Sequence, residues 1–241
     1  MTYCIGIKTN DGLVFASDSR TNAGLDNVNI YSKMMTHDVG DRTVVIVTSG
    51  NLGTSQAVYK SIEKDLNSSS GIMNLNTCND FEQIASYIGS LNIEHSSPQG
   101  INTDNVLLGS TFIVGGQIKG QQHELYLVYP QGNYIRPADS KPYLVIGEVK
   151  YGKPILDRVI KPDVSIGDAS RCALISMDST LKSDLTVGPP IDFTVLRKDE
   201  YKIASQKCLN LNDEEYSKVC NQWSDGIFKI FDSFPRFDWE K

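Results

Sequence analysis

The chain has 241 residues, of which 40% are hydrophobic, and it carries a formal net charge of −6 at pH 7. This acidic balance argues against a nucleic-acid-binding protein, and no apolar run is long enough to span a membrane. A chain of this length can bury a substantial core, so we expect one domain over residues 1–241.

The cysteines and the start of the chain predict a cytoplasmic protein. The segment Met-Thr-Tyr-Cys-Ile lacks the charged and apolar regions of a signal peptide. The five cysteines are an odd, scattered set without a Cys-x-x-Cys pair, namely Cys4, Cys78, Cys172, Cys208 and Cys220. This pattern indicates reduced, mostly buried thiols and no disulfide framework.

The first predicted elements form a hairpin at the chain start. Apolar residues alternate over residues 3–8, which predicts a strand, and Asn-Asp-Gly at 10–12 is a hairpin turn signal. Residues 13–17 then return as a second strand and bring Asp18 beside the chain start. After a polar loop, the β-branched run at 43–48 predicts another strand.

The remaining elements alternate between helix pairs and strands. Helices are predicted over residues 51–66, 80–93, 153–160 and 165–182 and from about residue 212, and strands over residues 107–118, 123–129, 143–146 and 191–197. This order is typical of an α+β fold with two sheets between helical layers. We therefore predict a four-layer αββα sandwich of two antiparallel sheets.

Thr2 is the first candidate for chemistry, because removal of Met1 would make it the N-terminus. A terminal threonine combines a nucleophilic hydroxyl with an α-amine that can accept its proton. The unperturbed pKa of that amine is about 7.7–8.0, so part of it is neutral near pH 7. Alone, the Met-Thr start is a weak signal.

Three further residues near the predicted strands strengthen this hypothesis. Asp18 can hold Lys33 charged, and the field of that ammonium would lower the pKa of the Thr2 hydroxyl and amine. Gly50 follows the strand at 43–48 and allows a backbone N–H to approach a developing oxyanion. Taken singly, Asp18 could cap a strand and Lys33 could be a solvated charge.

The sequence around these residues also resembles that of a known protein family. The segment Asp-Ser-Arg-Thr-Asn-Ala-Gly at 18–24 resembles the Asp-x-Arg-x-Thr-x-Gly segment of the N-terminal-nucleophile hydrolases, of the proteasome β-subunit and HslV type. It is most similar, with the opening Met-Thr-Tyr-Cys-Ile-Gly-Ile, to the bacterial Anbu-type members. The resemblance implies Thr2 as nucleophile, Asp18 and Lys33 as its activators, the Gly50 N–H as oxyanion donor, and Arg20 in support.

The second half departs from the family pattern. Asp-Leu-Thr-Val-Gly at 184–188 is similar to the family's Asp-x-x-Ser-Gly, which implies a supporting role for Asp184 but places Val187 at the serine position. Residues 146–148 contain no serine where the family has a Gly-Ser-Gly turn. Two functions therefore stay open: a threonine peptidase or amidase, and an assembly or binding protein with little turnover.

No cofactor or metal is expected. The three histidines, His37, His95 and His123, are far apart and lack metal-ligand spacing. The expected partners are a peptide or protein substrate and further copies of the chain in a ring or helical oligomer, as the resemblance implies, with no nucleic acid and no membrane. Residues 227–239 are rich in aromatic side chains, which either dock on a neighbouring subunit or pack on their own.

Overall fold

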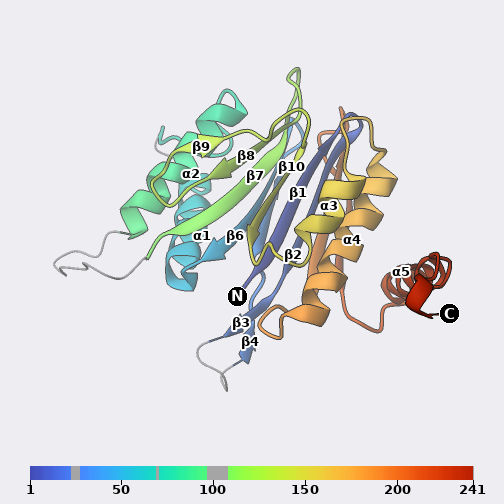
Figure 1. Cartoon of the computed structure of the whole chain (residues 1–241). Coiled ribbons are helices and arrows are strands. Elements are labelled where there is room, and N and C mark those ends of the chain that lie inside the picture. The colour runs from blue at the N-terminus through green and yellow to red at the C-terminus, as the bar shows by residue number, and fades with distance from the viewer. Residues whose placement is uncertain (23–27, 69–70, 97–107, 241) are drawn as a thin grey trace.

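Two antiparallel sheets of five strands form the centre of the computed structural model, which describes residues 1–22, 28–68, 71–96 and 108–240 (Figure 1). The first sheet has the order β10 (Tyr143–Gly147), β1 (Tyr3–Thr9), β2 (Gly12–Asp18), β11 (Ile191–Arg197) and β12 (Ile203–Leu209). The second has the order β5 (Met34–Asp38), β6 (Arg42–Gly50), β7 (Ser110–Ile118), β8 (Glu124–Val128) and β9 (Tyr134–Ile135). A separate hairpin joins β3 (Arg20–Asn22) to β4 (Val28–Ile30).

Helices cover the outer face of each sheet, which gives four layers (Figure 1). α1 (Leu52–Leu66) and α2 (Phe81–Ser96) lie on the second sheet, and α3 (Lys153–Val159) and α4 (Ile166–Ser183) lie on the first. α5 (Glu214–Asp232) follows, with a short 3-10 helix at Asp238–Glu240. The predicted αββα sandwich is confirmed.

Period-two alternation explains how both faces of each sheet are buried. In β1, Ile5 and Ile7 pack toward the helices, whereas Cys4 faces the other sheet. In β6, Val44 packs toward α1 and α2, and Val45 packs between the sheets. One core therefore lies between the sheets and one lies under each helical layer.

The predicted elements are present, with small shifts at their ends. The strand predicted from residue 107 begins at Ser110, and residue 107 itself lies outside the described residues. The short strands β3, β4, β5 and β9 and the edge strand β12 have no counterpart in the sequence prediction. β12 pairs only with β11 and exposes most of its polar residues, so its sequence lacks the alternation of a half-buried strand.

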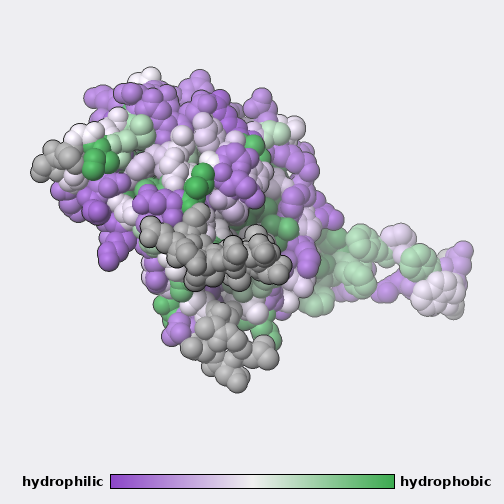
Figure 2. Space-filling model, turned by 90° about the vertical axis from the view of Figure 1, so that its left-hand side faces the viewer, coloured by the Kyte–Doolittle hydropathy of each residue, from purple (hydrophilic) through white to green (hydrophobic). Residues whose placement is uncertain are grey.

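α5 and the residues after it project from the body of the molecule (Figures 1 and 2). Only Tyr216 and Cys220 of α5 are buried. Large apolar side chains are exposed along the rest of this segment, namely Ile227, Phe228, Ile230, Phe231, Phe234, Phe237 and Trp239. We call residues 227–239 the C-terminal aromatic segment.

Across the part of the chain that the structure describes, no helix combines the length and apolar character needed to cross a membrane.

Candidate active site at the start of the chain

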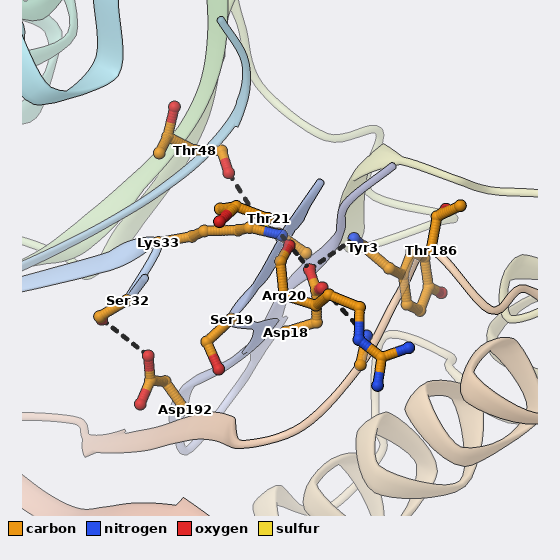
Figure 3. A network of polar contacts seen from close by, with 12 residues as sticks. Tyr3, Asp18, Ser19, Arg20, Thr21, Ser32, Lys33, Thr48, Thr186 and Asp192 are labelled. Atoms are coloured by element: carbon orange, nitrogen blue, oxygen red, sulfur yellow. Dashed lines mark hydrogen bonds and ion pairs between the residues drawn. The ribbon is translucent and has the colours of Figure 1, made fainter. Parts of the chain in front are cut away.

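A buried ion pair joins Asp18, the last residue of β2, to Lys33, which directly precedes β5 (Figure 3). Lys33 Nζ lies 2.8 Å from Asp18 Oδ1, and the two side chains are 5% and 0% exposed. Lys33 Nζ also donates to the carbonyl oxygen of Arg20 at 2.6 Å. The expected pairing of Asp18 with a buried Lys33 is therefore present.

Backbone groups from two further segments complete the environment of the Asp18 carboxylate. Asp18 Oδ1 accepts a hydrogen bond from the Tyr3 N–H at 3.0 Å, and Oδ2 accepts one from the Gly188 N–H at 3.2 Å. Burial raises the pKa of the Asp18 carboxyl, against the opposing pull of the Lys33 ammonium and the two N–H groups. One carboxylate thus ties together the chain start, β2, the residue before β5 and the segment after α4.

The chain start is also fixed from its other side. The Glu148 N–H donates to the carbonyl oxygen of Thr2 at 2.6 Å. Gly147, the last residue of β10, lies beside Thr2 with φ at +87°, a region that favours glycine. Thr2 itself is partly exposed, and Met1 is 58% exposed.

A cavity of about 780 Å³ opens at this position and is lined by Thr2, Lys33 and Gly50 together. Among the described residues that line it, only Arg20 and Lys33 have charged side chains. Gly50 ends β6 with φ at +124°, so glycine suits this backbone. The structure therefore brings the candidate nucleophile, its candidate activator and the candidate oxyanion donor to one cavity.

Arg20 is held against the segment that follows α4. Its Nη1 donates to the carbonyl oxygen of Leu185. A Cβ atom on Gly188 would lie 2.2 Å from Arg20 Cζ, so the guanidinium occupies the space that only a glycine leaves open. Arg20 therefore holds the residues around Gly188 in place, and Gly188 in turn donates to Asp18.

Asp184 caps the C-terminal end of α4, and its carboxylate interacts electrostatically with the N-terminal amine, which in this structure belongs to Met1. Burial acts to raise its pKa, but hydrogen bonds from Thr186 and the positive N-terminal amine hold the pKa of Asp184 below its ordinary value. Asp184 Oδ1 accepts from the Thr186 N–H at 2.8 Å and from Thr186 Oγ1 at 2.6 Å. The Asp184 carboxylate thus supplies negative charge close to the start of the chain.

The two places where the family has serines hold other residues here. Val187 is 1% exposed and packs in the apolar core under α4. Within residues 146–148, Glu148 is 4% exposed, and its Oε1 accepts from the Lys150 N–H at 3.0 Å. Neither Val187 nor residues 146–148 carry a hydroxyl group.

Several residues of this site carried no sequence signal. The Tyr3 N–H is a backbone donor that no motif marks, and Thr48 and Ser55 line the cavity without belonging to a recognisable pattern. Gly188 did carry a signal, because it matches the glycine of the family's second motif. Gly24, the last residue of the first motif, lies outside the described residues.

The histidines lie elsewhere. His37 contacts Asn76, His95 contacts Ser61, and His123 contacts the Thr9 carbonyl, each through Nε2. Within the described ranges, no three His, Cys, Asp or Glu side chains come together in a way that would hold a metal ion.

Comparisons with known proteins show the family to which the chain belongs. The family model "Proteasome subunit" matches residues 2–196. The chain is 23% identical over 214 residues to a proteasome subunit beta of Haloquadratum walsbyi, covering 86% of this chain and 77% of that protein.

Solved structures of Anbu proteins are similar over almost the whole chain. Anbu (ancestral beta-subunit) from Yersinia bercovieri is 36% identical with a TM-score of 0.93, covering 98% of this chain and 99% of that one. Anbu from Hyphomicrobium sp. strain MC1 is 37% identical with a TM-score of 0.89, covering 98% and 100%. The helical assembly of the Anbu complex from Pseudomonas aeruginosa is 37% identical with a TM-score of 0.92, covering 98% of each chain. The chain therefore belongs to the proteasome subunit family, within which it is an Anbu-type homologue.

Proposed function

We propose that this protein is a threonine-type N-terminal nucleophile peptidase or amidase, with Thr2 as the nucleophile once Met1 is removed. The observation that carries the proposal is the Lys33 ammonium, which is paired with buried Asp18 and shares one cavity with Thr2 and Gly50. A cation held in a site with little water acts strongly on nearby hydroxyl and amine groups.

The proposed reaction is acyl transfer in two steps. Thr2 Oγ attacks the amide carbonyl carbon while the free α-amine of Thr2 accepts the hydroxyl proton. The Gly50 N–H donates to the oxyanion that forms, and its collapse breaks the C–N bond as the leaving amine takes up the proton. Water, activated by the same α-amine, then hydrolyses the ester and restores Thr2.

Asp184 gives the α-amine its electrostatic partner in this proposal. A carboxylate close to the amine stabilises the ammonium that exists after proton transfer. The charge of Asp184 therefore substitutes in part for the two hydroxyl groups that this chain lacks at Val187 and within residues 146–148. Lys33 acts in the opposite direction, because its positive charge disfavours the ammonium form and so keeps a share of the α-amine neutral before the attack.

The cavity supports a peptide or protein substrate. Its volume of about 780 Å³ falls within the range of about 300–1,000 Å³ typical of ligand pockets. All five cysteines are free, which supports the cytoplasm as the location. We also propose self-association into a ring or helical oligomer through the C-terminal aromatic segment, because a relative of this chain forms a helical assembly.

A second candidate function is an assembly or binding protein with little turnover. Buried Val187 favours it, because an apolar side chain there cannot relay protons to the α-amine. This candidate keeps the fold and the oligomer but predicts no covalent adduct at Thr2.

Intact-mass measurement with a threonine-directed epoxyketone or vinyl-sulfone probe tests the proposal. We expect natively expressed protein to have lost Met1 and to gain one probe molecule. Thr2→Ala should fold with little change in stability and gain none, whereas the matched control Thr2→Ser retains a hydroxyl and should still react. Equal labelling of Thr2→Ala would exclude Thr2 as the nucleophile, and no labelling of processed wild type would favour the second candidate.

A further inference from the structure

A cluster of buried hydroxyl groups lies directly behind Gly50. Ser110 on β7 is opposite Gly50 in the β6–β7 register and is 0% exposed. Its Oγ donates to the carbonyl oxygen of Asn51 at 2.9 Å and lies 2.9 Å from Ser55 Oγ. Asn51, which follows Gly50 in the chain, is thus hydrogen-bonded to the side chain of Ser110, which lies opposite Gly50 in the sheet.

The Asn51 carbonyl receives further hydrogen bonds from the first turn of α1. The Ser55 N–H and Ser55 Oγ each lie 3.0 Å from that carbonyl oxygen. Asn51 Oδ1 also accepts from the Thr54 N–H at 3.1 Å and caps the helix. With Ser110 and Ser55 both directed at one carbonyl, the orientation of the Asn51 peptide is fixed.

Ser110 is held from behind by Asn92 on α2, which is also 0% exposed. Asn92 Nδ2 donates to the Ser110 carbonyl oxygen at 2.7 Å, and Asn92 Oδ1 accepts from the Ser110 N–H at 3.2 Å. A buried amide that satisfies both backbone groups of one residue leaves that residue little freedom to move.

Gly50 fits tightly into this arrangement. A Cβ atom on Gly50 would lie 2.9 Å from the Gly109 carbonyl oxygen and 3.0 Å from Ser110 Cα. The Gly50 backbone is therefore in close contact with β7, and the carbonyl of Asn51, the residue after it, is bonded to the Ser110 hydroxyl. The first constraint acts on Gly50 itself, and the second fixes the Asn51–Leu52 peptide, so the chain directly after the Gly50 N–H has little freedom to move.

We propose that Ser110, held by Asn92 and bonded together with Ser55 to Asn51, is a positioning residue that aims the Gly50 N–H into the cavity. The inference rests on the proposed function and deepens it. A preorganised donor stabilises an oxyanion most, because the donor needs no reorganisation during the reaction. Ser110 does not touch substrate; it acts through Asn51 and Gly50.

The variant Ser110→Ala separates this role from a purely structural one. A misplacement on the order of 1 Å can cost roughly a hundredfold in rate, so we expect kcat to fall about ten- to a hundredfold. KM should stay within about twofold, because the substrate's ground-state contacts with the cavity remain. The affinity for a peptide boronate, whose tetrahedral adduct places an oxygen at the oxyanion position, should fall in parallel with kcat.

Thr43→Val is the matched control. Thr43 is a buried residue at the opposite end of β6, and its hydroxyl has no hydrogen-bond partner among the described residues. The Thr43→Val variant removes a buried hydroxyl from the same sheet and should leave kcat and boronate affinity unchanged. A Ser110→Ala variant that melts at a lower temperature but keeps wild-type kcat and boronate affinity would overturn the positioning role.

A crystal structure of Ser110→Ala tests the inference independently of turnover. We expect the peptide between Ser49 and Gly50, which carries the Gly50 N–H, to rotate away from its wild-type direction, whereas an unchanged peptide would overturn the inference. If processed wild type neither hydrolyses peptides nor binds the boronate, the proposed function fails, and the orientation of this peptide still decides whether Ser110 positions it.

Discussion

Gly147 and Thr2 are in direct backbone contact: a Cβ atom on Gly147 would lie 1.8 Å from the Thr2 carbonyl oxygen. That same oxygen accepts the Glu148 N–H at 2.6 Å. No other amino acid fits at position 147 without moving one of the two segments. The position of Thr2, the candidate nucleophile, therefore depends on Gly147, which is 145 residues away in the sequence.

Gly147→Ala is expected to displace Thr2 and to slow probe labelling at least about tenfold, since small misplacements cost large factors in rate. The left-handed φ adds a cost of about 1–2 kcal/mol for a residue with a side chain. The rate of adduct formation by mass spectrometry measures the first effect. The control is Gly40→Ala, because Gly40 has a φ of +70° but no atom of the described residues within 4 Å of an added Cβ. The prediction fails if both variants label at the wild-type rate.

Removal of Lys33 should strongly destabilise the protein. Lys33→Ala leaves the fully buried Asp18 carboxylate without its cation, so we expect the free energy of unfolding to fall by about 3–5 kcal/mol. Labelling of Thr2 should also be lost, and Lys33→Arg should not restore it, because a planar guanidinium cannot replace a compact ammonium. Urea denaturation monitored by circular dichroism measures the stability.

The matched control for this variant is Lys8→Ala. Lys8 pairs with Glu124 at 3.1 Å, but the side chains are 30% and 20% exposed. A pair with this access to water contributes less than about 1 kcal/mol. Equal losses for the two variants would contradict the assignment of a buried, structurally essential pair.

His123 should make stability depend on pH. Burial lowers the pKa of His123, and Lys8 and Lys198 lower it further, against the Thr9 carbonyl and Glu124. The folded state therefore keeps His123 neutral, whereas the unfolded chain binds a proton below about pH 6.5. Since the unfolded state binds more protons in that window, the free energy of unfolding should fall as the pH drops from about 6.5 toward the folded-state pKa.

His123→Gln tests this, because glutamine can still donate to the Thr9 carbonyl but does not titrate in this range. Urea midpoints measured from pH 7 downward should show a shallower dependence in the variant than in wild type. His37→Gln serves as the control and should retain the contribution of His123. A slope that is the same with and without His123 would contradict the prediction.

Deletion of residues 234–241 should weaken self-association. Phe234, Phe237 and Trp239 are 57%, 64% and 81% exposed, and a group of apolar side chains of this size usually marks an interface. Sedimentation velocity of the full chain and the truncation measures the effect, and Val39→Ser, which removes an exposed apolar side chain from the body, is the control. A full-length chain that is monomeric at micromolar concentration would contradict self-association, and equal assembly of the truncation would exclude only the role of these residues.

The elements that the sequence predicts best are those whose local signal agrees with their burial. The helix predicted at 165–182 has its cap where expected, with Ser165 Oγ accepting from the Asp168 N–H at 3.0 Å. The alternation in β1 likewise corresponds to two buried faces. In both cases, residues close in sequence determine the outcome.

The contacts of the candidate site could be predicted only in part. Asp18 and Lys33 are 15 residues apart, Asp18 follows a predicted strand, and the family resemblance gives both a role, so their pairing could be expected. The bonds from Gly188 to Asp18 and from Ser110 to Asn51 join segments 170 and 59 residues apart. Such contacts depend on how the sheets stack, which no local pattern of hydrophobicity or charge encodes.

The position of β1 between β10 and β2 limits when an enzyme can remove Met1. Tyr3, two residues after Met1, is fully buried and already bonded to Asp18, so a peptidase that needs an extended N-terminus finds few free residues on the folded chain. β10 begins at residue 143, and at about 5–20 residues per second it is not synthesised until roughly 7–30 s after the start of translation. If Thr2 is the nucleophile that we propose, excision of Met1 is therefore favoured while the chain is still being translated, before the sheet closes around its own first strand.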